Sequence, residues 1–241
     1  MQNEAQWDRH ARWWQKEHSA GADAEYEDQI LPLVSRHLRG ARRVLDIGCG
    51  EGQVARRLAG DGAQVVGLDP TAGQIEVACQ RAGGPVYLRA CAEALPCRDR
   101  SFDTVLVCLA LEHVVAFESA IAEVARVLEP GGRFVLLLGH PLLQAPGSAW
   151  IDDRILGEMY WRVGAYLTDD RRFHEVAPGV ELLLIHRPLS HYVHAMGQAG
   201  LLIDDMVEEA PAPRVIAQSW GFPEAATIPR VLLISAVRVD E

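Results

Sequence analysis

The stretch VLDIGCGEG (Val44–Gly52) decides the fold of this 241-residue chain. An apolar run ends in three alternating glycines and a helical pattern begins at Gln53, so we expect a strand, a tight turn and a helix. The N–H groups that begin such a helix have no partner within it, and the glycines let a ligand approach them. The plain alternative is a tight turn that binds nothing.

The spacing of the glycines argues against a dinucleotide site. The G-x-G-x-x-G pattern of such sites would need a glycine where this chain has Gln53. The Asp46 carboxylate would repel a diphosphate, but it suits an ammonium or sulfonium group. Asp69, at the end of the next apolar run, can accept both hydroxyls of a ribose. The two acids predict a ribonucleoside ligand with a cationic tail, and a capping role for the helix after Asp69 is the plain alternative.

The pattern on both sides of this loop indicates an α/β protein. Strands that are apolar throughout and alternate with helices are typical of a parallel sheet covered on both faces. We expect a doubly wound, mostly parallel seven-stranded sheet, with strands at residues 43–47, 64–69, 85–90, 104–108, 133–139, 201–208 and 230–239. We expect helices at residues 7–18, 26–37, 53–59, 71–81, 116–128 and 189–199.

The composition disfavours several functional classes. The net charge is −10 and basic residues occur in pairs rather than in longer runs, which disfavours nucleic acid as a partner. The five cysteines form no C-x-x-C pair, which is typical of a reduced compartment. The first residues contain no leader-like apolar segment, and no apolar run approaches about 18 residues. We expect a cytoplasmic protein without membrane insertion, whose partner is a small molecule; the sequence leaves the oligomeric state open.

Five motifs follow one another along the chain: LDIGCGEG (45–52), GLDP (67–70), CAEALP (91–96), SFDTVLVCLALEHV (101–114) and LEPGG (128–132). In this order they resemble the class I S-adenosylmethionine-dependent methyltransferases, in the small-molecule branch similar to quinone-biosynthesis methyltransferases. The resemblance runs from Arg42 to Gly139, and the segment from His186 to Arg238 fits more loosely. It implies the class I methyltransferase fold, with N-terminal helices and a cap inserted after the fifth strand.

The organisation that we expect is a single methyltransferase domain over residues 1–241. N-terminal helices occupy 1–40, the cofactor-binding half 41–139, a substrate cap 140–187 and the C-terminal part of the sheet 188–241. The cap is rich in aromatic residues; Trp161 and Tyr166 either line an apolar lid or pack into a small core of their own. Trp7, Trp13 and Trp14 likewise either cover the site or fasten the first helix to the sheet.

The resemblance implies S-adenosyl-L-methionine as cofactor and S-adenosyl-L-homocysteine as its product. It assigns roles to eleven matching positions: Asp46, Gly48 and Gly50 at the methionine part, Gln53 at the start of the next helix, Asp69 at the ribose, Pro70, Gln74, Ala92 and Glu93 around the adenine, Leu109 at the methionine amine and Tyr26 at its carboxylate. Cys91 departs from the family, whose usual aspartate accepts from the adenine amino group. Since cysteine is a poor acceptor, Glu93 or a backbone carbonyl would replace it.

Three histidines are candidates for removing a proton from the methyl acceptor: His113, His140 and His186. The first two follow the fourth and fifth strands and the third lies where the cap rejoins the sheet; histidine titrates near neutral pH, which suits this task. A structural hydrogen bond is the alternative for each. We expect no metal site, because His191 and His194 lack a third ligand at a firm spacing and the acid pairs 152–153 and 169–170 fit solvated loops.

These observations favour direct, in-line methyl transfer to a small, partly apolar or aromatic molecule, with oxygen favoured over nitrogen or carbon. A S-adenosylmethionine-binding protein without transfer activity, serving as a regulator or partner subunit, is the main alternative; methylation of RNA or protein is another. The sequence leaves open the identity of the acceptor, the atom methylated, the use of a general base and the pathway.

Overall fold

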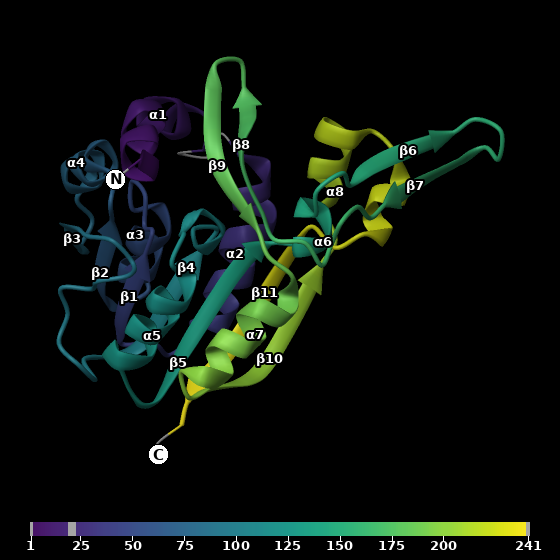
Figure 1. Ribbon diagram of the computed structural model, residues 1–241. Coiled ribbons are helices and arrows are strands. Elements are labelled where there is room, and N and C mark those ends of the chain that lie inside the picture. The colour runs from purple at the N-terminus through teal and green to yellow at the C-terminus, as the bar shows by residue number, and fades with distance from the viewer. Residues whose placement is uncertain (1, 19–22, 240–241) are drawn as a thin grey trace.

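The computed structural model describes residues 2–18 and 23–239, whose arrangement is shown in Figure 1. Within these ranges seven strands form one sheet in the order β10-β11-β5-β4-β1-β2-β3. They are β1 (Arg43–Ile47), β2 (Gln64–Asp69), β3 (Val86–Arg89), β4 (Phe102–Cys108), β5 (Leu128–Gly139), β10 (Leu201–Glu209) and β11 (Val231–Arg238). The predicted seven-stranded sheet is confirmed.

The directions of the strands bring the carboxyl ends of β1, β2 and β4 to the same edge of the sheet. β3, β2, β1, β4 and β5 are parallel to one another, and β11 is antiparallel to β5 and β10. From β1 the chain builds the sheet outward through β2 and β3, and then returns to the other side of β1 with β4. In open α/β sheets ligands bind at the carboxyl ends of the strands where this reversal occurs, here between β1 and β4.

Helices cover both faces of the sheet, as a doubly wound fold requires. Val105 and Val107 of β4 belong to the core under α5 and α7, whereas Leu106 and Cys108 belong to the core under α2, α3 and α4. Because successive strand residues face opposite sides, a strand buried on both sides must be apolar throughout. The helices are α2 (Leu31–His37), α3 (Gln53–Gly60), α4 (Ala72–Arg81), α5 (Phe117–Val127) and α7 (Leu189–Gln198).

Most bounds lie within two residues of the prediction and the first helix begins at Gln2 rather than at residue 7, whereas two further differences have a clear physical cause. The helix expected over 26–37 is a π-helical turn, η1 (Tyr26–Ile30), followed by α2, whose second residue is Pro32. Proline has no N–H to donate, so the α-helical ladder is interrupted there. Strand β5 begins at Leu128 rather than at residue 133, because Leu128 pairs with Phe102 before the register shifts.

The segment between β5 and α7 forms a short helix and two hairpins. These are α6 (Pro141–Gln144), β6–β7 (Ala149–Asp153 and Glu158–Arg162) and β8–β9 (Asp170–Ala177 and Val180–His186). The β8–β9 hairpin rises beside the first helix, α1 (Gln2–His18), whereas β6–β7 projects away from it (Figure 1).

The aromatic residues of this segment pack locally. Trp150 lies edge-on to Trp161 and to Phe222, with ring centroids 5.4 and 4.8 Å apart. The Tyr166 hydroxyl accepts a hydrogen bond from the Leu189 amide at 3.0 Å. Of the two alternatives in the sequence, the structure favours a small core of their own over a lid.

The remaining described elements are η2 (Leu111–His113), α8 (Pro213–Val215), η3 (Ile216–Trp220) and η4 (Pro223–Thr227). Among the helices of the described ranges, none has both the length and the apolar character needed to cross a membrane.

Candidate functional site

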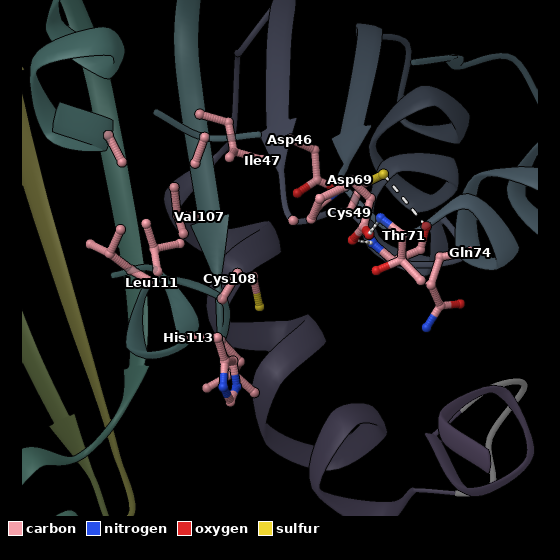
Figure 2. Close-up of a pocket in the computed structure, with 18 of the residues that line it drawn as sticks. Asp46, Ile47, Cys49, Asp69, Thr71, Gln74, Val107, Cys108, Leu111 and His113 are labelled. Carbon is pink, nitrogen blue, oxygen red and sulfur yellow. Dashed lines mark hydrogen bonds between the residues drawn. The ribbon is translucent and has the colours of Figure 1, made fainter. Parts of the chain in front are cut away.

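A pocket of about 290 Å³ lies at the carboxyl ends of β1, β2 and β4 (Figure 2). His113 lines it, whereas His140 and His186 are not part of its wall. All of the positions that the sequence assigns to a cofactor lie in this wall: Tyr26, Asp46, Gly48, Gly50, Gln53, Asp69, Pro70, Gln74, Ala92, Glu93 and Leu109. The fold thus brings together residues that are spread over more than eighty positions of the sequence.

The glycine loop gives the pocket its floor. The amides of Gly48 and Cys49 both donate to the Leu68 carbonyl, at 2.7 and 3.0 Å, which fastens the loop to the end of β2. Gly48 has a φ of +73°, and a Cβ there would collide with the Ala110 side chain. Gly50 has a φ of +54°, but a Cβ there would meet nothing within 4 Å. Gly48 is therefore required by packing, whereas Gly50 keeps open space in the pocket.

Asp46 places a buried carboxylate at the end of β1. Its side chain is 1% exposed, and its Oδ2 has no hydrogen-bond partner among the described residues. Burial, with a smaller contribution from the Asp69 carboxylate, raises the pKa of Asp46 to about 7. A buried carboxylate without full hydrogen bonding is costly, so this site favours a positively charged or hydrogen-bond-donating ligand.

Asp69 lies on the neighbouring strand end and is held by the loop as well as by the next helix. Its Oδ2 accepts from the Gly50 amide at 2.9 Å and its Oδ1 accepts from the Thr71 amide at 2.8 Å. Burial raises the pKa of Asp69, while these hydrogen bonds act in the opposite direction. The Thr71 side chain also forms a hydrogen bond with this carboxylate, so Asp69 links the glycine loop to the start of α4 and keeps only part of its acceptor capacity for a ligand.

The far end of the pocket is formed by α4 and by the loop after β3. Gln74 is buried, and its Oε1 accepts from Gln15 Nε2 of α1 at 2.9 Å. The Pro70 carbonyl accepts from Arg89 Nε at 2.8 Å. Ala92 and Glu93 add an apolar methyl and a carboxylate to this wall, and Cys91 lies beside them.

The near end is formed by the turn after β4 and by Tyr26. Leu109 has a φ of +51°, a left-handed conformation that is strained for leucine, and its amide donates to the Leu137 carbonyl at 2.8 Å. Burial, with the nearby Cys108 and Asp46, raises the pKa of Tyr26 well above its ordinary value. Its hydroxyl therefore keeps its proton and can donate to a ligand.

Helix α1 covers the open side of the pocket. Trp7, Trp14 and His18 contribute to the wall. Ala11 is buried where α1 crosses α4, and Gln15 Nε2 donates to the Gly73 carbonyl at 3.1 Å. Of the tryptophans for which the sequence left open a covering or a fastening role, Trp7 and Trp14 line the pocket and Trp7 also packs on His113, whereas Trp13 is not part of this wall.

His113 is the catalytic candidate that the structure places in the pocket, as Figure 2 shows. Its Nδ1 lies 2.6 Å from the Leu183 carbonyl, and its ring is edge-on to Trp7 with centroids 5.0 Å apart. A carbonyl can only accept, so Nδ1 carries a proton and the neutral ring has its lone pair on Nε2.

His140 and His186 lie elsewhere and make structural contacts. His140 caps α6: its Nδ1 accepts from the Leu142 amide at 3.1 Å, and its Nε2 lies 2.8 Å from Glu208 Oε1. His186 is buried, and its Nε2 lies 2.8 Å from the Tyr166 carbonyl. The plain alternative, a structural hydrogen bond, matches the surroundings of both.

Arg187 is a residue of the site that sequence reasoning missed. Its buried guanidinium donates to the carbonyls of Leu111, Val114 and Val115 at 3.4, 2.6 and 3.2 Å. It also lies over the Phe117 ring, 4.3 Å from the centroid. Arg187 therefore fixes the segment that carries His113. Nothing in the local sequence around residue 187 indicates this role, because its partners are more than seventy residues away.

The charged residues of the pocket wall are acidic, and one of them, Glu51, is paired with Arg56 and Arg81, which lie outside the wall. The wall contains Asp46, Glu51, Asp69 and Glu93, and no lysine or arginine from the residues described here. Nor does the described part of the chain contain a group of three or more His, Cys, Asp or Glu arranged to hold a metal ion. The pocket therefore suits a cationic or neutral ligand better than an anion.

Comparisons with known proteins agree with this geometry. A family model described as a methyltransferase domain matches residues 45–136. A solved S-adenosylmethionine-dependent methyltransferase from Mesorhizobium loti is 30% identical, with a TM-score of 0.75, and the match covers 90% of this chain and 98% of that one.

Curated relatives match over shorter stretches. A protein of Mycobacterium tuberculosis named an uncharacterized methyltransferase is 40% identical over 142 residues, which are 59% of this chain and 54% of that protein. A ubiquinone biosynthesis O-methyltransferase of Chelativorans is 40% identical over 137 residues, 53% of this chain and 54% of that protein. The matched part spans about half the length of these relatives.

Proposed function

Because the chain belongs to the class I S-adenosylmethionine-dependent methyltransferases, we propose that it transfers a methyl group from S-adenosylmethionine to a small, partly apolar or aromatic molecule. Oxygen is the favoured acceptor atom, ahead of nitrogen and carbon. The observation that carries this proposal is the buried Asp46 carboxylate, whose Oδ2 has no partner among the described residues and which faces a pocket without lysine or arginine from that part of the chain.

The residues of the pocket fit this donor. A ligand that carries a sulfonium and an ammonium group would supply the positively charged partner that the Asp46 carboxylate lacks. Asp69 would accept from the ribose hydroxyls with its remaining acceptor capacity, and the Gly50 position leaves room beside it. Gln74, Ala92 and Glu93 would border the adenine, with the Glu93 carboxylate as an acceptor for its amino group in place of Cys91.

Two groups would hold the methionine end. Tyr26, whose hydroxyl stays protonated, would donate to the methionine carboxylate. The strained turn at Leu109 would present its backbone to the amine. Strain of this kind persists where the surrounding structure enforces it, and the Leu137 carbonyl does so here by holding the Leu109 amide.

When bound, S-adenosylmethionine supplies an electrophilic methyl group on a sulfonium. The chain's own residues align the acceptor with it and exclude water, which is the main contribution of a protein to an in-line displacement. Trp7, Trp14 and Val114 provide an apolar and aromatic wall for the acceptor. His113 Nε2 would take the proton of an acceptor hydroxyl as its oxygen bonds to the methyl carbon and the carbon–sulfur bond breaks, or the proton of an ammonium beforehand, which frees the nitrogen lone pair. Nδ1 stays fixed on the Leu183 carbonyl.

The test is methyl transfer from isotope-labelled S-adenosylmethionine to a panel of phenols, catechols and arylamines, followed by mass spectrometry. We expect methylation of at least one member, and a loss of about a hundredfold or more in His113→Ala with unchanged affinity for S-adenosylhomocysteine. His140→Ala should lose about 1–2 kcal/mol of stability as a helix cap, without losing turnover per folded molecule.

Two outcomes would contradict parts of the proposal. Donor binding without transfer to any member would favour the non-catalytic alternative. If turnover depended on His140 and not on His113, the proton acceptor would be misassigned.

A further inference from the structure

A second cavity lies beside the donor pocket. It is a crevice of about 720 Å³ between the end of α1, the turn of the β8–β9 hairpin and the segment formed by α8 and η3. Its wall comprises Trp13, Trp14, Glu17, His18, Asp23, Ala24, Glu25, Val176, Ala177, Pro178, Leu182, Val215 and Gln218. Trp14 and His18 line both cavities, so the crevice adjoins the pocket at the side covered by α1.

The crevice has an aromatic wall on α1. Trp13 is edge-on to Trp14 with centroids 6.2 Å apart, and Trp14 lies over the His18 ring at 4.1 Å. Both indoles are half-buried and so keep part of their surface toward the crevice. Across from them, Val176, Pro178 and Leu182 of the β8–β9 hairpin add apolar contacts. A flat ring fits between such walls, since aromatic groups prefer stacked or edge-on neighbours.

The charged groups of the crevice are acidic. Glu17, Asp23 and Glu25 belong to its wall, which receives no lysine or arginine from the described residues. Asp23 accepts from His18 Nδ1 at 2.6 Å and from the Glu25 amide at 2.8 Å. Burial raises the pKa of Asp23, but these hydrogen bonds outweigh it and hold the pKa below its ordinary value, so the carboxylate stays charged. Glu25 is paired with Arg230 and the exposed Glu17 with Lys16, and both of these cations lie outside the wall.

We propose that this crevice binds the distal end of the methyl acceptor, and that this end is an aromatic group that is neutral or carries an amine, rather than a carboxylate or phosphate. The proposal rests on the proposed function, because the crevice is assigned to the acceptor through the wall that it shares with the donor pocket. An anionic group would meet carboxylates in both cavities and no lysine or arginine side chain from the described residues, and the His18 ring shared by both walls is already bound to Asp23. An ammonium group would meet the same carboxylates favourably, next to indole faces that also attract cations.

Three indoles that differ in charge test this proposal. Tryptamine, 3-methylindole and indole-3-acetate are titrated calorimetrically into the full chain saturated with S-adenosylhomocysteine. We expect tryptamine to bind on the order of tenfold more tightly than indole-3-acetate, with 3-methylindole between them, and this preference should shrink as salt is added.

Variants place the binding in the crevice. Ala177→Trp fills it from the hairpin turn and should weaken all three indoles by about fivefold or more, as should Trp13→Ala, which removes a wall. Ile155→Trp, at the exposed tip of the β6–β7 hairpin, is the matched control and should change nothing. Glu17→Gln should reduce the preference for tryptamine over indole-3-acetate by about two- to fivefold, whereas Glu158→Gln on the other hairpin should not.

Saturation with S-adenosylhomocysteine is measured first, so that the two proposals fail separately. A protein that does not bind it contradicts the proposed function and this proposal together. A protein that binds it but takes up indole-3-acetate as well as tryptamine contradicts the acceptor class alone. Indole binding that is unchanged in both Ala177→Trp and Trp13→Ala contradicts the location.

Discussion

At the scale of single residues, Asp46 is the group on which donor binding depends most. A carboxylate that is 1% exposed loses its hydration, and its Oδ2 recovers no hydrogen bond from the described residues. The physical consequence is a carboxylate that is poorly stabilised until a cation or donor group arrives. The neighbouring Asp69 differs because the Gly50 and Thr71 amides satisfy one lone pair on each oxygen.

Asp46→Asn should change how stability depends on pH. Burial and Asp69 raise the pKa of Asp46 to about 7, so the folded protein binds a proton there that the unfolded chain releases near pH 4. The wild type should therefore lose about 1.4 kcal/mol of stability per pH unit, relative to the variant, as pH rises from about 4 to 7, with no further loss above. Urea unfolding at a series of pH values measures this difference.

The exposed Asp61→Asn serves as control for that experiment and should follow the wild type. If the free energy of unfolding changed with pH in the same way in the wild type and in Asp46→Asn, Asp46 would be ionised without penalty in the free protein. The unpartnered Oδ2 of Asp46 would then give no reason for the site to favour a cationic ligand.

Gly50 and Gly131 offer a matched pair for testing the loop. Their φ angles are +54° and +74°, and at neither would a Cβ meet anything within 4 Å, but only Gly50 lines the pocket. Substitution of either glycine by alanine should therefore lower the free energy of unfolding by a similar amount, on the order of 1 kcal/mol. Affinity for S-adenosylhomocysteine, measured by calorimetry, should fall by tenfold or more, about 1.4 kcal/mol, in Gly50→Ala alone. Equal affinities in the two variants would remove Gly50 from the donor site.

At the scale of elements, α1 is the part that closes the pocket. It reaches across α4 through Ala11 and Gln15 and touches η2 through Trp7 and His113. Because its side chains form part of the pocket wall, we expect α1 to move when a nucleoside enters or leaves. The glycine loop and the strand ends, by contrast, belong to the core of the sheet and have no such freedom.

A crosslink between α1 and α4 tests this closure. A Cβ on Gly73 would lie 3.4 Å from the Ala11 Cβ, close to the separation of about 3.5–4.5 Å that a disulfide spans. Oxidised Ala11→Cys/Gly73→Cys should release S-adenosylhomocysteine more slowly than the reduced protein in stopped-flow experiments, and a reducing agent should restore the rate.

Each single cysteine variant, oxidised in the same way, is the control, since the chain also has native thiols such as the exposed Cys79. Equal release rates in the crosslinked and reduced protein would mean that the nucleoside passes without any movement of α1.

The two hairpins show where element prediction from sequence ends. Their aromatic content marks residues 140–187 as more than a linker, yet the pattern cannot say which hairpin faces the pocket. The β8–β9 hairpin approaches it through the Leu183 carbonyl, which contacts His113, whereas Leu182 lines the crevice. Both are apolar positions of an ordinary strand. The aromatic Trp161 belongs to the other hairpin and packs on Trp150. Which strand turns toward a site is decided by long-range packing that leaves no local pattern.

At the scale of the whole molecule, the sequence predicts the sheet well because a parallel sheet buried on both faces has a strong pattern. The bounds of β1 and β2 are those expected, since each lies between clear breaks in hydrophobicity. Element ends fail where other physics acts: Pro32 interrupts the second helix, and pairing with Phe102 extends β5 toward its start.

The donor side of the site could also be predicted, because its residues lie in consecutive strand ends that any such sheet brings together. The acceptor side could not. His140 has the expected position after a strand, but its ring points to Glu208 and the start of α6. His18 reaches the pocket wall from α1, and Arg187 holds the segment that carries His113; both act through tertiary packing between remote segments.

The most direct test of the electrostatic basis of the site compares two adenosine-containing ligands, which carry opposite charges on the group attached to the ribose. Calorimetric titration of the wild-type chain with S-adenosylmethionine and with NAD⁺, whose diphosphate is anionic, measures both affinities under the same conditions. We expect S-adenosylmethionine to bind in the micromolar range and NAD⁺ to give no measurable heat. Binding of NAD⁺ that equals or exceeds that of S-adenosylmethionine, or no heat from S-adenosylmethionine at millimolar concentration, would contradict a pocket built around Asp46 and Asp69 for a cationic nucleoside.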